Sequence, residues 1–169
     1  APGESAPKTP FWHGDSLGRS VETGKAVGGF VRHLLDKGPD ERRRMLMEEY
    51  GLDRWAAANL SASVEEEVEV AGTAPTDRTL VVQRFRDEIG DWRLAVLSPF
   101  GARVHAPWAM ALTQRWKQAT GLEVDAIWSD DGMAFRFPDA EEVPDSRSIL
   151  LDPDEEQTLL IDQLADSSL

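Results

Sequence analysis

The sequence contains no cysteine, and this absence excludes several kinds of site at once. Disulfide bonds, thiolate zinc sites and cysteine nucleophiles all require a thiol. A chain without thiols fits a reducing compartment, and we expect a cytoplasmic protein. Histidine is also scarce: His13, His33 and His105 are far apart and show no i,i+4 pairing of the kind that holds a metal. No metal site is predicted.

Long apolar runs are also missing. No segment reaches the length of a membrane-spanning helix, and no apolar core of a signal peptide is present. The chain starts at Ala1 without a methionine, in a stretch rich in proline, serine and glycine. We therefore expect it to be a fragment of a longer polypeptide.

The composition nevertheless predicts a folded domain. The 169 residues are 41% hydrophobic and include six tryptophans, enough for one domain with its own core. The net charge of −13 argues against a general nucleic-acid-binding protein. The charge is uneven, since residues 78–117 carry seven Lys/Arg against three acids, whereas residues 139–169 carry ten acids and one base. A phosphate-facing patch and an ordinary solvated surface both fit this pattern, and charge alone favours the second.

Residues 1–9 have the composition of a disordered leader, and residues 10–75 that of a helical part. Ser20 can cap a helix that runs to about Lys37, and Asp40 and Asp53 can cap two further helices. Gly24 and Gly28 lie on the apolar stripe of the first helix. Glycine is a poor helix former, so the pattern indicates that another backbone comes close at both positions.

Residues 76–138 predict a sheet crossed by one helix. Two hairpins are expected, because turn residues separate pairs of apolar strand-like runs and an Asp-Gly step is a strong hairpin signal. Pro107 can open the helix between the hairpins, and Gly121 can close it. Residues 139–169 form an acidic tail with a short helical pattern at 155–164. The predicted class is α+β, with N-terminal helices followed by an antiparallel sheet. The sheet could be open or barrel-like. The four strand-like runs of the two expected hairpins are Thr79–Arg86, Trp92–Leu97, Leu122–Trp128 and Met133–Phe137.

No catalytic residue emerges from the sequence. The stretch from Gly18 to Ala26 resembles a phosphate-binding loop, but its glycines are one residue too far apart. Ala26 also stands where such a loop has the Ser or Thr whose hydroxyl binds magnesium. The stretch also lies inside a predicted amphipathic helix with no strand before it. No nucleophile elbow is present.

Two blocks of the sequence resemble a known family. They read TDRTLVVQRFRDEIGDWRLAVLSPFGARVHAPWAMAL, from Thr76, and PFWHGDSLGRSVETGKAVGGF, from Pro10. Both are similar to the large helicase-related (Lhr) family of bacterial ATP-dependent DNA helicases, in the region called the DEAD/DEAH-associated domain. The resemblance implies an accessory domain of a 3′-to-5′ helicase that helps to form a channel for single-stranded nucleic acid.

The resemblance also implies partners and cofactors. The expected partners are single-stranded DNA or an RNA–DNA hybrid, together with RecA-type motor and winged-helix domains of the same chain. ATP and Mg²⁺ belong to the parent's motor domains, and no cofactor is expected in this fragment. Because the motor motifs are absent, the fragment should not hydrolyse ATP. The alternative is an acidic structural or protein-interaction module that scaffolds the motor domains without touching DNA.

The candidate nucleic-acid-binding residues fall into three groups. An exposed Trp12 in a glycine-flanked loop could stack on a base, or it could close the edge of the core, and the two interpretations are equal. Arg103 and His105 precede the predicted helix start, where backbone N–H groups attract phosphate, although a plain surface loop fits equally well. Arg84 and Arg86 could contact phosphates or pair with neighbouring acids. The full set is Trp12, His13, Arg19, Arg84, Arg86, Arg103 and His105.

Overall fold

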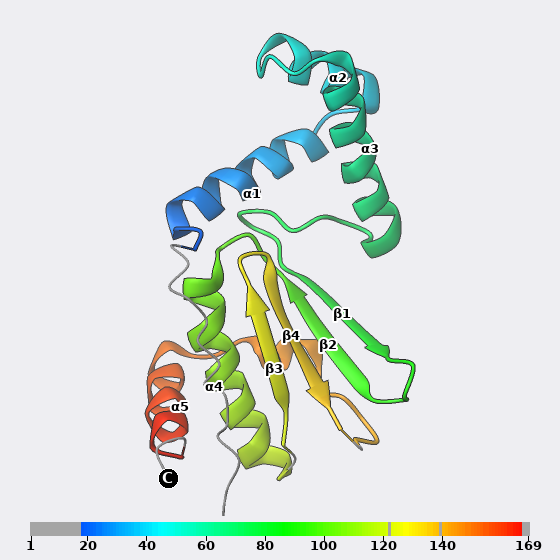
Figure 1. Cartoon of the computed structure of the whole chain (residues 1–169). Coiled ribbons are helices and arrows are strands. Elements are labelled where there is room, and N and C mark those ends of the chain that lie inside the picture. The colour runs from blue at the N-terminus through cyan, green and yellow to red at the C-terminus, as the bar shows by residue number, and fades with distance from the viewer. Residues whose placement is uncertain (1–17, 122, 139, 167–169) are drawn as a thin grey trace, which may run out of the picture.

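The computed structural model describes residues 18–121, 123–138 and 140–166, and its architecture is α+β (Figure 1). Three helices come first: α1 (Val21–Leu35), α2 (Pro39–Glu48) and α3 (Arg54–Ala71). They are followed by two hairpins with a long helix between them, and by a short helical tail. Within the described ranges, no helix is both long enough and apolar enough to cross a membrane.

Local sequence signals explain where the first helices begin. The Ser20 hydroxyl accepts a hydrogen bond from the Thr23 N–H, and the Asp53 carboxylate accepts from the Trp55 and Ala56 N–H groups, so both predicted caps are confirmed. The predicted cap at Asp40 is wrong. Helix α2 begins at Pro39, two residues before the start that a cap at Asp40 would give, because the fixed φ of proline suits the first helical position, and Gly38 is its N-cap.

One buried arginine joins the three helices. Arg42 is only 6% exposed and donates to the carbonyl oxygens of Leu34, Lys37 and Ser61, while its guanidinium pairs with Glu65. Around it lies a small apolar core of residues that α1, α2 and α3 contribute. These are Leu34, Met45, Leu46, Ala57 and Val64. The helical part therefore has a core of its own beside that of the sheet.

The sheet is open, with strand order β1-β2-β4-β3 and antiparallel pairing throughout. The predicted hairpin-helix-hairpin order is confirmed, but the sheet does not close into a barrel. Its outer strands β1 and β3 lie at opposite edges, because four strands of five or six residues are too few to curl around a core of their own. The strands are β1 (Val81–Arg86), β2 (Trp92–Leu97), β3 (Asp125–Ser129) and β4 (Gly132–Phe137).

Helix α4 (Ala102–Thr120) packs on one face of the sheet and forms the main core with it. Trp116 makes edge-on contacts with Phe135 and Phe137, at ring-centroid distances of 4.8 and 5.2 Å. The helix starts five residues before the predicted Pro107, which lies inside it. A 3-10 turn, η1 (Ser146–Ile149), and helix α5 (Pro153–Asp166) follow, and α5 packs beside α4 (Figure 1).

Gly24 and Gly28 mark where α1 crosses the segments that lead into and out of the sheet. A β-carbon on Gly24 would lie 2.4 Å from the Pro99 carbonyl oxygen, and one on Gly28 would lie 2.3 Å from the Asp77 nitrogen. Only glycine allows such an approach. The predicted close backbone contact at both positions is confirmed.

The face of the sheet opposite α4 is here named the open face. By strand register, Gln83 and Phe85 lie on it from β1, Arg93, Ala95 and Leu97 from β2, Ala134 and Arg136 from β4, and Asp125 and Ile127 from β3. Ile127 is 71% exposed there.

Candidate nucleic-acid interface

Arg19 anchors the start of the described chain to the turn between β3 and β4. Its backbone N–H donates to both carboxylate oxygens of Asp130 at 3.0 Å. Its guanidinium donates to the carbonyl oxygens of Pro99 and Asp130 and pairs with Asp131 at 2.8 Å. The predicted contact residue Arg19 is therefore held by the protein itself.

Gly101 completes this junction. Its φ of +94° lies in the region that favours glycine, and an added β-carbon would lie 2.4 Å from the Arg19 carbonyl oxygen. The end of β2, the start of α4 and the beginning of α1 therefore meet at one point.

The N-terminus of α4 already has an anion bound to it. Asp130 accepts a hydrogen bond of 2.9 Å from the Ala102 N–H, the first residue of the helix. This bond, together with the one from the Arg19 N–H, holds the pKa of Asp130 below its ordinary value. At this helix end the sequence allows a phosphate site or a plain surface loop, and a carboxylate of the protein's own hairpin occupies it.

His105 is fully buried beneath the same junction. Its Nδ1 lies 2.7 Å from the Ser129 carbonyl oxygen, and its Nε2 lies 3.0 Å from the Ser98 hydroxyl. Because a carbonyl can only accept, Nδ1 carries a proton. The side chain joins α4 to the ends of β2 and β3, and with no exposed surface it has a structural role at this position.

The remaining predicted arginines differ in whether their guanidinium groups have partners within the protein. Arg86 lies over the Trp92 ring, 4.6 Å from its centroid, and donates to the carbonyl oxygens of Gly90 and Glu141. Arg84, on β1, and Arg103, in the first turn of α4, are exposed, and neither guanidinium makes a hydrogen bond or ion pair with another described residue. These two are the candidates with a guanidinium free for phosphate.

Most of the local positive charge in residues 78–117 is neutralised within the fold. Four of its seven cations are held in ion pairs with carboxylates. The pairs are Arg78–Asp77, Arg93–Asp87, Arg115–Glu155 and Lys117–Glu123. The excess of cations in the sequence therefore does not form one broad basic surface, since its members serve the sheet and the contact between α4 and α5.

The structure does not bring the candidate residues into one site. Arg19, Arg103 and His105 gather at the α4 N-terminus, and Arg84 and Arg86 lie on the edge strand β1. Trp12 and His13 lie outside the described residues. Sequence reasoning missed Asp130, because its Asp-Gly neighbourhood reads only as a turn and its partners are 28 and 111 positions away. Across the described ranges, no group of three or more acids and histidines could hold a metal ion.

Comparison with known proteins adds a family and a structural relative. Residues 74–169 match the family model described as DEAD/H associated. The chain is 40% identical over its whole length to the Lhr helicase/probable uracil glycosylase of Mycolicibacterium smegmatis, and 38% identical to the Lhr helicase/uracil glycosylase of Escherichia coli. It spans 11% of the length of each.

A solved structure has the same fold. It is described as the Mycobacterium smegmatis helicase Lhr bound to ssDNA and AMP-PNP, and it matches 95% of this chain with a TM-score of 0.80 and 37% sequence identity. The chain covers 20% of that protein.

Proposed function

The chain belongs to the DEAD/H associated family, and on that premise we propose that it is the accessory domain of an Lhr-type ATP-dependent 3′-to-5′ DNA helicase. In this role it helps to form the channel for a single DNA strand, or for one strand of an RNA–DNA hybrid. It has no motor activity of its own. ATP and Mg²⁺ act in RecA-type motor domains elsewhere in the same polypeptide, beside a winged-helix domain.

One observation carries the proposal. A helicase structure that holds single-stranded DNA matches nearly the whole chain at 37% identity, so the fold and more than a third of the side chains are shared. The alternative of an acidic module that scaffolds the motor without contacting DNA is not favoured, because the matched structure contains a DNA strand.

The proposed contact surface lies around the α4 N-terminus. Arg103 is exposed and free to bind a phosphate there, and Arg19 is anchored beside it by Asp130 and Asp131. Trp12 would stack on a base, an interaction of about 1–3 kcal/mol in single-strand-binding proteins. Arg84 would extend the phosphate track along β1. His105 supports the junction from inside.

Fluorescence titration with a labelled single-stranded oligonucleotide tests this surface. We expect binding that weakens as salt rises, because phosphate contacts release counterions. Trp12→Ala and Arg103→Ala should each weaken it, and Arg103→Ala should also reduce the slope of log affinity against log salt by about 0.7. Arg44→Ala is the matched control, since it removes an exposed cation from α2, in the helical part.

Both variants binding like the Arg44→Ala control, in this chain and in the longer helicase polypeptide, would contradict the proposed surface. DNA-stimulated ATP hydrolysis by the purified chain would contradict the accessory role, because this activity requires a motor.

A further inference from the structure

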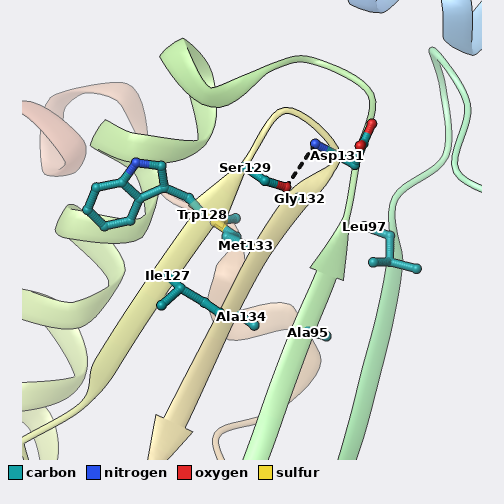
Figure 2. A pocket seen from close by; sticks show the side chains of 9 residues that line it. All are labelled: Ala95, Leu97, Ile127, Trp128, Ser129, Asp131, Gly132, Met133 and Ala134. Atoms are coloured by element: carbon teal, nitrogen blue, oxygen red, sulfur yellow. Dashed lines mark hydrogen bonds between the residues drawn. The ribbon is translucent and has the colours of Figure 1, made fainter. Parts of the chain in front are cut away.

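The open face carries a row of apolar side chains that other described elements leave uncovered. Ala95, Ala134 and Ile127 lie side by side on three neighbouring strands, because Ala134 pairs in register with both of the others (Figure 2). They line a shallow cavity of about 240 Å³, well above the share of about 30 Å³ that one water takes in the liquid. The cavity is large enough for side chains of a partner.

A second cavity, of about 290 Å³, lies between α3 and the strands β1 and β2. Leu97 lines both cavities, so the two are adjacent, and together they are here named the Leu97 groove. Val70 of α3 is 76% exposed at its margin, and Ile127 is 71% exposed at the other side. Apolar side chains exposed together over such a surface are typical of an interaction site.

The wall of the groove is acidic. Glu66 and Glu67 of α3 line it, and neither pairs with a cation among the described residues, whereas the adjacent Glu65 pairs with Arg42. The two arginines on the open face, Arg93 and Arg136, are held by Asp87 and by Asp91 and Asp125. The groove therefore presents an apolar floor beside uncompensated negative charge.

We infer that the Leu97 groove binds a polypeptide segment that carries apolar side chains next to Lys or Arg, and that this segment belongs to the same helicase polypeptide outside this chain. The inference rests on the proposed function, since it requires the longer helicase. The apolar side chains cover Ile127, Ala134 and Leu97, and the cations meet Glu66 and Glu67. The matched relatives are about nine times longer than this chain, so such a parent has ample chain to supply the segment.

Charge disfavours two other occupants, a DNA strand and a second copy of this chain. The phosphates of a DNA strand would face Glu66 and Glu67 without a free cation on the groove to offset them. A second copy of this chain carries the same net charge of −13, which opposes its approach to the acidic wall. A basic, apolar segment is complementary in both respects.

Hydroxyl-radical footprinting read by mass spectrometry tests the inference, because it reports the solvent exposure of individual side chains. The probe is applied to this chain and to the longer helicase polypeptide, without DNA or nucleotide. We expect labelling of Ile127 and Val70 to fall at least fivefold in the longer protein. Ile89, 74% exposed in the turn between β1 and β2, lies away from the groove and serves as the internal reference.

Charge reversal then tests the chemistry of the occupant. In the longer protein, Glu66→Lys with Glu67→Lys should restore labelling of Ile127 and Val70 at least threefold. Glu69→Lys is the matched control, since Glu69 is exposed on the same helix but does not line the groove. In this variant, labelling of Ile127 and Val70 should stay as in the wild type.

Equal labelling in the two proteins would overturn the inference, as would protection that charge reversal leaves unchanged. Protection that appears only with an oligonucleotide would assign the groove to DNA instead, and protection that grows with the concentration of this chain alone would assign it to a second copy. Oligonucleotide binding is measured on the same samples. Oligonucleotide binding without protection of the groove would overturn this inference and leave the proposed function standing. Protection of the groove without oligonucleotide binding would contradict the proposed DNA contact and leave the groove assigned to a polypeptide segment.

Discussion

Gly28 of α1 lies directly against the backbone of Asp77, in the connector that enters the sheet. A β-carbon at this position would be 2.3 Å from the Asp77 nitrogen. The contact continues at the side chains, where Arg32 donates to Asp77 through Nε at 2.8 Å, a bond that holds the pKa of Asp77 below its ordinary value. One turn of α1 thus attaches the helical part to the sheet through a backbone contact and an ion pair.

Replacing either contact glycine should destabilise the protein. The atoms that a new methyl group would meet at Gly24 and Gly28 belong to the backbone and cannot move aside cheaply. We expect Gly24→Ala and Gly28→Ala each to lower the free energy of unfolding by about 1–3 kcal/mol, the usual cost of overpacking. Urea unfolding followed by tryptophan fluorescence measures it.

Gly29→Ala is the matched control on the same helix. Its β-carbon would meet only the Arg32 guanidinium, at 3.9 Å. Because alanine is the better helix former, we expect a gain of up to about 1 kcal/mol. An equal gain in all three variants would show that helix propensity, and not the backbone contact, governs these positions.

Asp130 should make the free energy of unfolding depend on pH in the acid range. Its folded-state pKa is lowered, so its contribution is present above the unfolded-state pKa of about 4 and is lost as the pH falls through the lower folded-state value. We expect Asp130→Asn to be less stable than the wild type at pH 7 and to lose less stability between pH 5 and pH 2.5. Thermal unfolding across this range measures both effects.

The control for Asp130 is Glu69→Gln, which changes an exposed carboxylate without a described partner. Its pH profile should follow that of the wild type. If Asp130→Asn and the wild type lost stability in parallel on acidification, folding would not lower the pKa of Asp130.

His105 and Arg103 should separate stability from binding. His105→Ala leaves the Ser129 carbonyl and the Ser98 hydroxyl without their partner and opens a cavity, so we expect a loss of about 1–3 kcal/mol or more. The folded fraction should bind a single-stranded oligonucleotide as the wild type does.

Arg103→Ala should leave the unfolding midpoint unchanged and weaken binding. A His105 variant that folds normally but binds poorly would reverse this assignment.

Arg42 should not tolerate replacement by lysine. Three backbone carbonyls on separate segments receive its guanidinium, and a single ammonium group cannot reach them in the same geometry. We expect Arg42→Lys to cost about 1–3 kcal/mol, because buried acceptors lose their donor. Arg43→Lys, at the next position, alters an exposed pair with Asp40 and should change stability by less than about 0.5 kcal/mol. Similar losses in both variants would contradict a role for the buried network.

Part of the candidate interface was accessible from sequence and part was not. Arg84 and Arg103 stand out as cations on a strand and near a helix start, and the structure leaves both exposed. His105 carries the same signal two positions later, yet it is buried. Its neighbours are Ser98, which follows β2, and Ser129, which ends β3, so no local pattern could distinguish the His105 and Arg103 side chains.

The sequence by itself determined the features that nearby residues control. The caps at Ser20 and Asp53, the two hairpins and the close approach at Gly24 and Gly28 follow from the conformational limits and hydrogen-bonding capacity of single residues. Only the tertiary structure decided the rest: the open sheet with its β2-β4 pairing, the start of α4 before Pro107, and the carboxylate of Asp130 on that helix end. These depend on partners brought together across many positions, up to 111 between Arg19 and Asp130, and such contacts form only when the whole core packs.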